Sequence, residues 1–225
     1  MQFSESVISF YEQLNSQLSL PKGVELIYPF TDKEVWECFN SFVNSFYKGE
    51  QGRILLLGIN PGRFGAGVTG IPFTDPYHLS EFCGIETPFE KRKELSSIYI
   101  YDLIMALGGP IEFYKRFYIS SVCPLGFIKD GKNYNYYDDD KLYTGLKSFI
   151  ISSIEKQLEF PCSRRVAYSL GKGKNYKILS KLNEEHKWFD EIIALGHPRW
   201  IMQYQRKNYS LHLENTAGIL AKAKY

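Results

Sequence analysis

The chain has 225 residues, 44% of them hydrophobic, and its 27 Lys and Arg against 25 Asp and Glu leave a net charge of +2. This length and composition predict one globular domain over residues 1–225 with a substantial apolar core. The charge balance excludes a basic field over the whole surface, so any site for a polyanion must be local.

Four cysteines, spaced about 40 residues apart, form no CxxC pair and have no histidine at zinc-type spacing: Cys38, Cys83, Cys123 and Cys162. This pattern is typical of reduced thiols and argues against a disulfide framework or a metal site. The N-terminal segment has helical periodicity and lacks the basic start and apolar stretch of a signal peptide. No apolar run reaches the about 18 residues of a membrane span. We therefore expect a soluble, cytoplasmic protein that has no membrane contact and is monomeric.

The elements predicted first are two helices, over residues 3–16 and 33–46. Four short apolar or β-branched runs are the predicted strands: 53–58, 117–122, 165–170 and 191–196. Helical patterns lie between or after them, over 89–107, 140–158, 174–185, 198–207 and 211–223. Apolar strands joined by helices indicate a parallel sheet covered on both faces. The predicted fold is an α/β, three-layer αβα sandwich with a central four-stranded parallel sheet.

Ligands bind beyond the carboxyl ends of the strands in a sheet of this kind. Here the strand exits read GINPG, SVCPLGF, GKGKNY and GHPRW, each with Gly or Pro beside a polar or aromatic group. We expect them to converge on one cleft, although strand termination alone would also explain the Gly and Pro residues. Residues 130–140 are the most loop-like segment, and its Asp residues are expected to cap the next helix rather than bind metal.

The first exit, GINPGRFGAG, lacks both the Lys-Ser/Thr pair of a P-loop and the G-x-G-x-x-G spacing of a dinucleotide site. Its glycines allow close approach of the backbone to a ligand, and Pro61 biases Asn60 towards an extended conformation. The Asn60 amide does not titrate, so we expect it to orient a water or a substrate group by hydrogen bonds.

His197 follows the last strand in Gly-His-Pro, where Pro198 suits the first turn of a helix. A histidine at a helix start tends to stay neutral, and a neutral imidazole can donate to a developing anion. A capping or packing role would explain this motif equally well. We expect Asn60 and His197 at opposite outer strand exits. Such a pair suits cleavage of a nucleobase N-glycosidic bond, in which the leaving group takes negative charge without a strong acid.

The stretch Gly58–Phe73, GINPGRFGAGVTGIPF, resembles the first motif of the uracil-DNA glycosylase superfamily. The similar form, G-M-N-P-G-P-F-G-M-x-x-T-G-V-P-F, belongs to the single-strand-selective monofunctional uracil-DNA glycosylases and their bacterial second branch. Cys-Pro-Leu at 123–125, Gly-Lys-Gly-Lys at 171–174 and His-Pro at 197–198 follow in the family's order. The resemblance covers about residues 50–207. We expect the N-terminal helices (1–48) and the C-terminal helix (210–225) to pack on this domain.

The resemblance implies a monofunctional DNA glycosylase that hydrolyses the N-glycosidic bond of uracil and of related deaminated or 5-substituted bases in DNA. It implies that Asn60 positions the attacking water and that His197 stabilises the departing base. It also implies that the flipped base stacks on Phe73, contacts the backbone of Ile59 and has room beside C5 at Gly62. The product would be an abasic site for base excision repair. No metal or organic cofactor is expected, and neither motif has a lysine placed for a lyase cut.

Two positions depart from the family pattern. Ser121 stands where the family usually has Asn two residues before Cys-Pro-Leu. One hydroxyl discriminates less than an amide, so we expect activity on uracil with acceptance of hypoxanthine or xanthine. The family's His-Pro-Ser-Pro-Arg-Asn, whose end forms the wedge that enters the duplex, reads His-Pro-Arg-Trp-Ile-Met here. Arg199, Trp200 or Ile201 would be the wedge, unless Trp200 and Ile201 are simply the buried face of a helix.

Several basic side chains are candidates for contacts with DNA phosphates, which position DNA without reading its sequence. They are Arg63, Lys172 and Lys174, together with Lys177, Arg206 and Lys207. The Lys-Arg-Lys run at 91–93 is expected to be solvated on a helix face. The partner is expected to be DNA, single- or double-stranded.

The sequence Asp75-Pro76-Tyr77-His78 matches part of the water-activating motif in the main uracil-DNA glycosylase family. That motif comes directly off the first strand, where this chain has Asn60, so we expect His78 to be a surface or helix-start residue instead.

Two other functions stay open at this point. One is a non-catalytic binder of single-stranded DNA or modified bases with the same fold, which the presence of both Asn60 and His197 argues against. The other is a hydrolase of free nucleotides.

Overall fold

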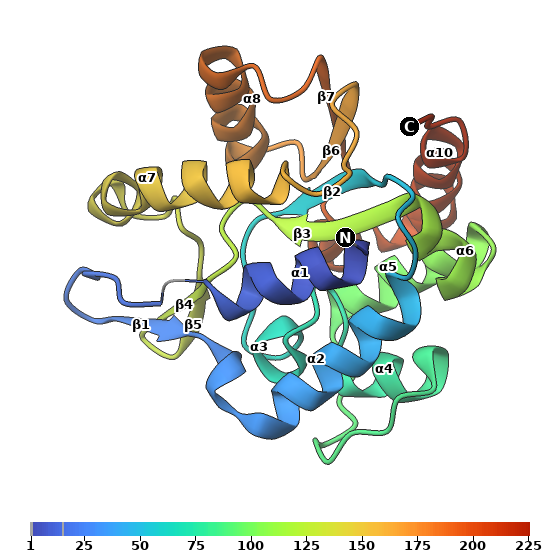
Figure 1. Cartoon of the computed structure of the whole chain (residues 1–225), viewed down its shortest axis with the longest axis horizontal. Helices are drawn as coiled ribbons and strands as arrows, with labels where there is room; N and C mark the ends of the chain where they lie inside the picture. The colour runs from blue at the N-terminus through green and yellow to red at the C-terminus, as the bar shows by residue number, and fades with distance from the viewer. Residues whose placement is uncertain (1, 15) are drawn as a thin grey trace.

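The computed structural model describes residues 2–14 and 16–225. A four-stranded parallel sheet with strand order β3-β2-β6-β7 lies at its centre (Figure 1). The strands are β2 (Ile54–Gly58), β3 (Phe117–Ser121), β6 (Val166–Leu170) and β7 (Glu191–Leu195). Three of them are buried along their whole length, which explains their apolar sequences. The predicted parallel sheet and its four strands are confirmed.

Helices flank this sheet, as the predicted αβα arrangement requires (Figure 1). The longer ones are α1 (Phe3–Glu12), α2 (Lys33–Phe46), α5 (Leu95–Ala106), α6 (Gly109–Arg116), α7 (Asp140–Gln157), α8 (Lys174–His186) and α10 (Tyr209–Ala221). Shorter ones are α3 (Ala66–Thr69), α4 (Pro76–Cys83), α9 (Pro198–Tyr204), and the 3-10 helices η1 (Pro29–Thr31) and η2 (Arg206–Asn208). One sheet face meets α1 and α7, because Tyr118 contacts Phe3 and the Ser120 hydroxyl donates to Gln157.

A second, antiparallel sheet was not predicted. It has the order β1-β4-β5, with β1 (Val24–Ile27), β4 (Gly126–Lys129) and β5 (Lys132–Tyr134). The loop predicted over 130–140 is therefore wrong for 132–134. Asp130 and Gly131 both have positive φ, 50° and 66°, and this two-residue turn joins β4 to β5 as a hairpin. The predicted helix cap is confirmed, because Asp139 accepts hydrogen bonds from the N–H groups of Lys141 and Leu142.

The predicted helix over 89–107 begins only at Leu95, so the basic run at 91–93 does not lie on a helix. Each of its side chains has a partner. Lys91 pairs with Glu81 at 3.2 Å, Arg92 lies 4.2 Å from the centroid of the Phe64 ring, and Lys93 lies 3.9 Å from that of Tyr77. These contacts fasten the segment before α5 to the first motif and to α4.

The carboxyl end of β2 leads into the first motif. At its opposite end, β2 is anchored by a buried arginine. Arg53 is fully buried, and its guanidinium donates to the carbonyl oxygens of Tyr114, Gln51 and Lys48 at 2.6, 3.1 and 2.9 Å. It also lies 4.3 Å from the ring centroid of Phe3. Burial lowers the pKa of Arg53, and the three carbonyls compensate for the water that this cation has lost.

One apolar core runs through the chain from α1 to α10 and includes both Phe3 and Leu220. The four cysteines are free thiols. Within residues 2–14 and 16–225, no helix combines the length and the apolar surface needed to cross a bilayer.

Candidate active site

A cavity of about 460 Å³ lies beyond the carboxyl ends of the parallel strands. It brings together most of the site residues predicted from the sequence: Ile59, Asn60, Gly62, Arg63, Phe73, Ser121, His197 and Arg199. Among the other predicted residues, Lys172, Lys174 and Trp200 line an adjoining groove of about 740 Å³. Lys177, Arg206 and Lys207 line neither of these two hollows. Ile59 and His197 line both hollows, so the two are continuous at these residues.

Asn60 follows β2, which is an inner strand, while His197 follows the outer strand β7. The expectation that both residues follow outer strands is therefore wrong for Asn60, because β3 pairs with one edge of β2 and makes it an inner strand. The Asn60 side chain is held on three sides. Its oxygen accepts from the N–H of Tyr136 at 3.1 Å, and its nitrogen donates to the carbonyls of Tyr134 and Pro61, both at 3.3 Å. A carbonyl oxygen has two lone pairs, so one remains for a water.

The residues that hold Asn60 are themselves fixed from behind. The Tyr136 hydroxyl donates to the side-chain oxygen of Asn175 at 2.8 Å, and the Asn175 amide donates to the carbonyl of Gly58 at 3.4 Å. Both side chains are buried. This chain of hydrogen bonds connects the β5 segment, the start of α8 and the end of β2, so Asn60 lies in a rigid frame.

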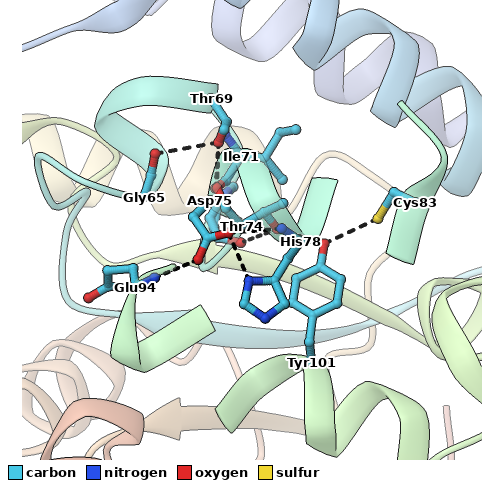
Figure 2. Close-up of polar contacts among 10 residues, drawn as sticks. Gly65, Thr69, Ile71, Thr74, Asp75, His78, Cys83, Glu94 and Tyr101 are labelled. Atoms are coloured by element: carbon cyan, nitrogen blue, oxygen red, sulfur yellow. Dashed lines mark hydrogen bonds and ion pairs between the residues drawn. The ribbon is translucent and has the colours of Figure 1, made fainter. Parts of the chain in front are cut away.

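Phe73 has a left-handed backbone, with φ of 54°, which is uncommon for a bulky residue. Its ring lies against Gly58, where an added Cβ would come within 2.8 Å of the ring. The Thr69 hydroxyl holds the turn before it, since it donates to the carbonyl of Thr74 at 2.6 Å and accepts from the N–H of Ile71 at 3.2 Å (Figure 2). The surroundings therefore impose a strained conformation that places an aromatic ring at the cavity wall.

The Asp75-His78 pair, the other motif noted in the sequence, lies under this wall. Asp75 is fully buried and caps α4, and its carboxylate accepts from the N–H of His78 at 2.9 Å, from the His78 ring nitrogen Nδ1 at 2.8 Å and from the N–H of Glu94 at 2.7 Å (Figure 2). The predicted helix-start position of His78 is confirmed, but the side chain is buried against Tyr101 rather than on the surface. Neither residue lines the cavity, so the pair supports the wall and faces no ligand.

Gly62 and Arg63 meet the β4–β5 hairpin at the cavity mouth. A Cβ added to Gly62 would lie 3.1 Å from the Asn133 amide nitrogen, so a side chain here would push this amide back by a few tenths of an ångström. The N–H of Arg63 donates to the Asn133 side chain at 3.1 Å, and its guanidinium donates to the carbonyl of Gly131. Arg63 is thus bound to the hairpin, where it also lies over the Phe64 ring.

Ser121 ends β3 directly beside Gly58 in the register of the sheet. It is buried and lines the same cavity as Phe73. The next two residues continue the hydrogen bonds between β3 and β2. The N–H of Val122 donates to the carbonyl of Gly58 at 3.0 Å, and the N–H of Cys123 donates to the carbonyl of Ile59 at 3.1 Å. The Ile59 carbonyl therefore already accepts one hydrogen bond within the protein, and its second lone pair remains.

His197 precedes α9, and its side chain caps no backbone group, so the capping alternative is wrong. Burial, and to a smaller extent the positive charge of Arg199, lower the pKa of His197 from 6.5 to about 4. The lowered pKa agrees with the predicted neutral state of His197, and its largest cause is burial. Gly171, which has a φ of 144°, packs against the His197 ring. A Cβ added to Gly171 would lie 3.4 Å from Cδ2 of that ring. A neutral imidazole is thus held between the two hollows.

The three candidates for the wedge separate clearly. Ile201 is fully buried and packs against Gly196, so a wedge role for it is wrong. Trp200 is 46% exposed, which excludes the alternative that it is only a buried helix face. Arg199 is exposed and pairs with Glu94 at 3.9 Å.

Glu94 is a functional candidate that the sequence did not indicate. It lines the cavity from the segment before α5, its Oε1 accepts from the Ser96 hydroxyl at 3.2 Å, and burial raises its pKa. A carboxylate here favours positive charge that develops on a ligand and disfavours negative charge. No sequence signal marked it, because its backbone bond to Asp75 depends on the tertiary fold.

Within the described residues, no three His, Cys, Asp or Glu side chains are grouped in a way that could hold a metal ion. The cavity instead offers an aromatic ring, a neutral histidine, an amide and a hydroxyl, which together suit a planar polar ring compound. Fold and cavity define an α/β protein with a ligand site beyond the carboxyl ends of its parallel strands. Comparison with protein families then identifies it further: the family model of the Uracil DNA glycosylase superfamily matches residues 45–220, and the chain belongs to this superfamily.

Known relatives agree with this assignment. The chain is 30% identical over 136 residues to the single-strand selective monofunctional uracil-DNA glycosylase of Rattus norvegicus, with 52% of this chain and 48% of the relative covered. The Mus musculus protein of the same name is 29% identical over the same shares. The chain thus spans about half the length of the curated relatives it matches. The crystal structure of wild-type SMUG2 from Pedobacter heparinus is 41% identical, with a TM-score of 0.94 over 98% of this chain and 97% of that one.

Proposed function

We propose that the chain is a monofunctional DNA glycosylase, which hydrolyses the N-glycosidic bond of uracil and of related deaminated or 5-substituted bases in DNA. The observation that supports this most is the single cavity between Asn60 and His197, with Phe73 and Ser121 in its wall. The printed names of the relatives, single-strand selective monofunctional uracil-DNA glycosylases, support the same substrate class.

In the proposed reaction the flipped base enters the cavity and stacks on Phe73, while Ser121 meets its polar edge and Gly62 leaves room for a substituent at C5. The glycosidic bond breaks dissociatively. Neutral His197 donates a hydrogen bond to the anionic base as it leaves, and water held by Asn60 adds to C1′ of the sugar. Glu94 would favour the positive charge on the sugar.

We propose hydrolysis without a lyase cut and without a metal or organic cofactor. Lys132 lines the cavity from β5, but its side chain is exposed. An exposed ammonium group lacks the desolvation that activates a nucleophilic lysine. The expected product is an abasic site, for base excision repair.

DNA would reach the cavity across its basic rim. Arg63, Lys172, Lys174 and Arg199 are proposed to contact phosphates, and exposed Trp200 or Arg199 would fill the emptied stack. We further propose that the whole chain acts as one domain and as a monomer, and that it is cytoplasmic. The four free thiols are consistent with the last point only, since thiols stay reduced in the cytosol.

The test is base release from uracil-containing oligonucleotides by wild type and by Asn60→Ala and His197→Ala. We expect each variant to lose about 100-fold or more in rate, because each loses a group that acts in the transition state. Asn208→Ala and His186→Ala, remote from the cavity, are matched controls expected to keep full activity. Binding without release by the wild type would favour the non-catalytic binder. Turnover of free deoxyuridine alone would favour the nucleotide hydrolase.

A further inference from the structure

The groove beside the base cavity has two walls of different origin. One wall is the loop after β6 and the start of α8, with Lys172, Lys174 and Asn175. The other wall is the C-terminal helix α10, which lies beyond the segment that carries the family motifs. The exit of β7 and Trp200 form the floor and rim between them, and the Trp200 and His212 ring centroids are 6.0 Å apart.

The groove-facing side of α10 is a regular stripe. His212, Asn215, Thr216 and Ile219 follow the spacing of one helix face and all line the groove. Asn215 is exposed and Ile219 is 41% exposed, so neither is needed for the core. The Thr216 hydroxyl bonds the Tyr99 hydroxyl at 2.9 Å, which fixes the stripe relative to α5.

A second contact fixes the far end of the helix. The guanidinium of Arg116 donates to the carbonyls of Leu220, Ala221 and Ala223 at 2.9, 3.2 and 3.3 Å. Arginine at a helix C-terminus satisfies carbonyls that lack helical partners and interacts favourably with the dipole. Helix α10 is therefore a firm wall, and its exposed stripe is available to a partner.

The chemistry of the groove fits a strand of nucleic acid. Among the described residues that line it are two lysines, two histidines, and the aromatic rings of Tyr137 and Trp200, and none of them is Asp or Glu. Cationic groups that follow a phosphate backbone, interleaved with aromatic faces for bases, are the features of single-strand binding grooves. The groove also joins the base cavity at Ile59 and His197.

We propose that α10 is the second wall of the DNA site, and that its His212, Asn215 and Ile219 contact the strand immediately next to the flipped nucleotide. This inference rests on the proposed glycosylase function. It gives the C-terminal helix a role in holding substrate, and it places the flanking strand between α10 and the lysines of the loop after β6.

Paired charge changes on α10 test the proposal. Asn215→Asp with Ile219→Asp would repel phosphates, and we expect KM for a uracil-containing single-stranded 20-mer to rise about tenfold at low salt, with kcat unchanged. Asn215→Lys with Ile219→Lys would lower KM several-fold and steepen its salt dependence. A trinucleotide with a central deoxyuridine keeps only one nucleotide on each side of the flipped base, so we expect its KM to change less than that of the 20-mer in both variants.

A matched control adds the same charges elsewhere on the helix. Ser210→Asp with Ala221→Asp places two carboxylates roughly opposite the stripe, about 160–180° around the axis from His212. We expect it to behave as wild type. Equal effects of the control and the groove variant, or no effect of either charge sign at the groove, would overturn the proposal.

Fluorescence anisotropy with the same 20-mer lacking uracil separates this proposal from the catalytic one. If the wild type releases no base but the groove variants still shift affinity in opposite directions, the glycosylase assignment fails and the groove stands. If base release by the wild type is normal but DNA affinity does not change in the groove variants, the proposal for α10 is wrong and the glycosylase assignment is unaffected.

Discussion

The side-chain oxygen of Asn60 accepts a hydrogen bond from the backbone N–H of Tyr136 at 3.1 Å, across 76 positions of sequence. Its nitrogen faces two carbonyl oxygens, those of Tyr134 and Pro61. The orientation of the amide is thus set by the antiparallel hairpin and not by the parallel sheet that carries Asn60.

Replacement of Asn60 by Asp tests this arrangement. A carboxylate cannot donate to the two carbonyls, whereas a protonated carboxyl can, so we expect the pKa of the new Asp to be raised in the folded state. The folded state then keeps its proton above the pH at which the unfolded chain loses it. The free energy of unfolding of Asn60→Asp should therefore fall as pH rises from about 4 to 8, by about 1–3 kcal/mol. Urea unfolding across this range measures it, with Asn60→Ala as the reference for the pH dependence that all other groups contribute.

Gly58→Ala addresses the contact beneath Phe73. The new methyl group would lie 2.8 Å from the aromatic ring, which must move because Gly58 belongs to a buried strand. We expect a loss of about 1–3 kcal/mol in stability and weaker base release, through a displaced stacking surface. Gly145→Ala is the control, since nothing lies within 4 Å of its added Cβ and the residue is in a helix interior. It should gain about 0.5–1 kcal/mol and leave activity unchanged.

Ser121→Asn changes the group that meets the base edge. An amide offers a donor and an acceptor in fixed positions, so we expect release of hypoxanthine and xanthine to fall about tenfold relative to uracil. A release assay across a panel of lesions measures the ratio. The interpretation of Ser121 as the specificity residue fails if the wild type releases only uracil and the variant behaves identically.

His197 should titrate far from neutrality. Its pKa of about 4 against 6.5 means that the unfolded chain takes up a proton at a pH where the folded protein does not. Stability from this group is therefore complete above pH 6.5 and declines as pH falls towards 4. NMR titration of the ring should show the low pKa, and Arg199→Gln should raise it because a neighbouring positive charge is removed. An inflection near 6.5 in the wild-type ring signals would contradict this account.

Asp75→Asn tests the support beneath the wall. The carboxylate accepts three hydrogen bonds, and an amide in its place keeps the shape but turns one acceptor into a donor. We expect a loss of about 1–3 kcal/mol in the free energy of unfolding, since the side chain is fully buried. Asp138→Asn, in an exposed turn with Asn135, should cost far less in the same denaturation experiment.

The parallel sheet was predictable because its strands are short apolar runs separated by helical patterns. Asn60 and His197 were predictable as site residues because each follows such a run. The hairpin that holds Asn60 was not predicted, although its Asp130-Gly131 turn is a recognised hairpin signal. The short, polar β5 has no apolar alternation, and its burial pattern shows why: two of its three residues are exposed.

The helix α10 was predicted, but Glu94 and the groove-lining face of α10 were missed for a different reason. Each reaches its hollow through contacts between segments distant in sequence, such as the bond of Glu94 to Asp75 and that of Thr216 to Tyr99. Local patterns carry no information on such contacts. The strand order was equally inaccessible, so Asn60 was expected at an outer exit.

The left-handed backbone of Phe73 has an evolutionary consequence. Asn or Gly would adopt this conformation with less strain, so a substitution that relaxes the turn should yield a more stable protein with a poorer stacking surface. Selection for thermal stability alone would therefore favour replacement of the phenylalanine at position 73. Stability screens that ignore base release would therefore tend to enrich inactive variants at position 73.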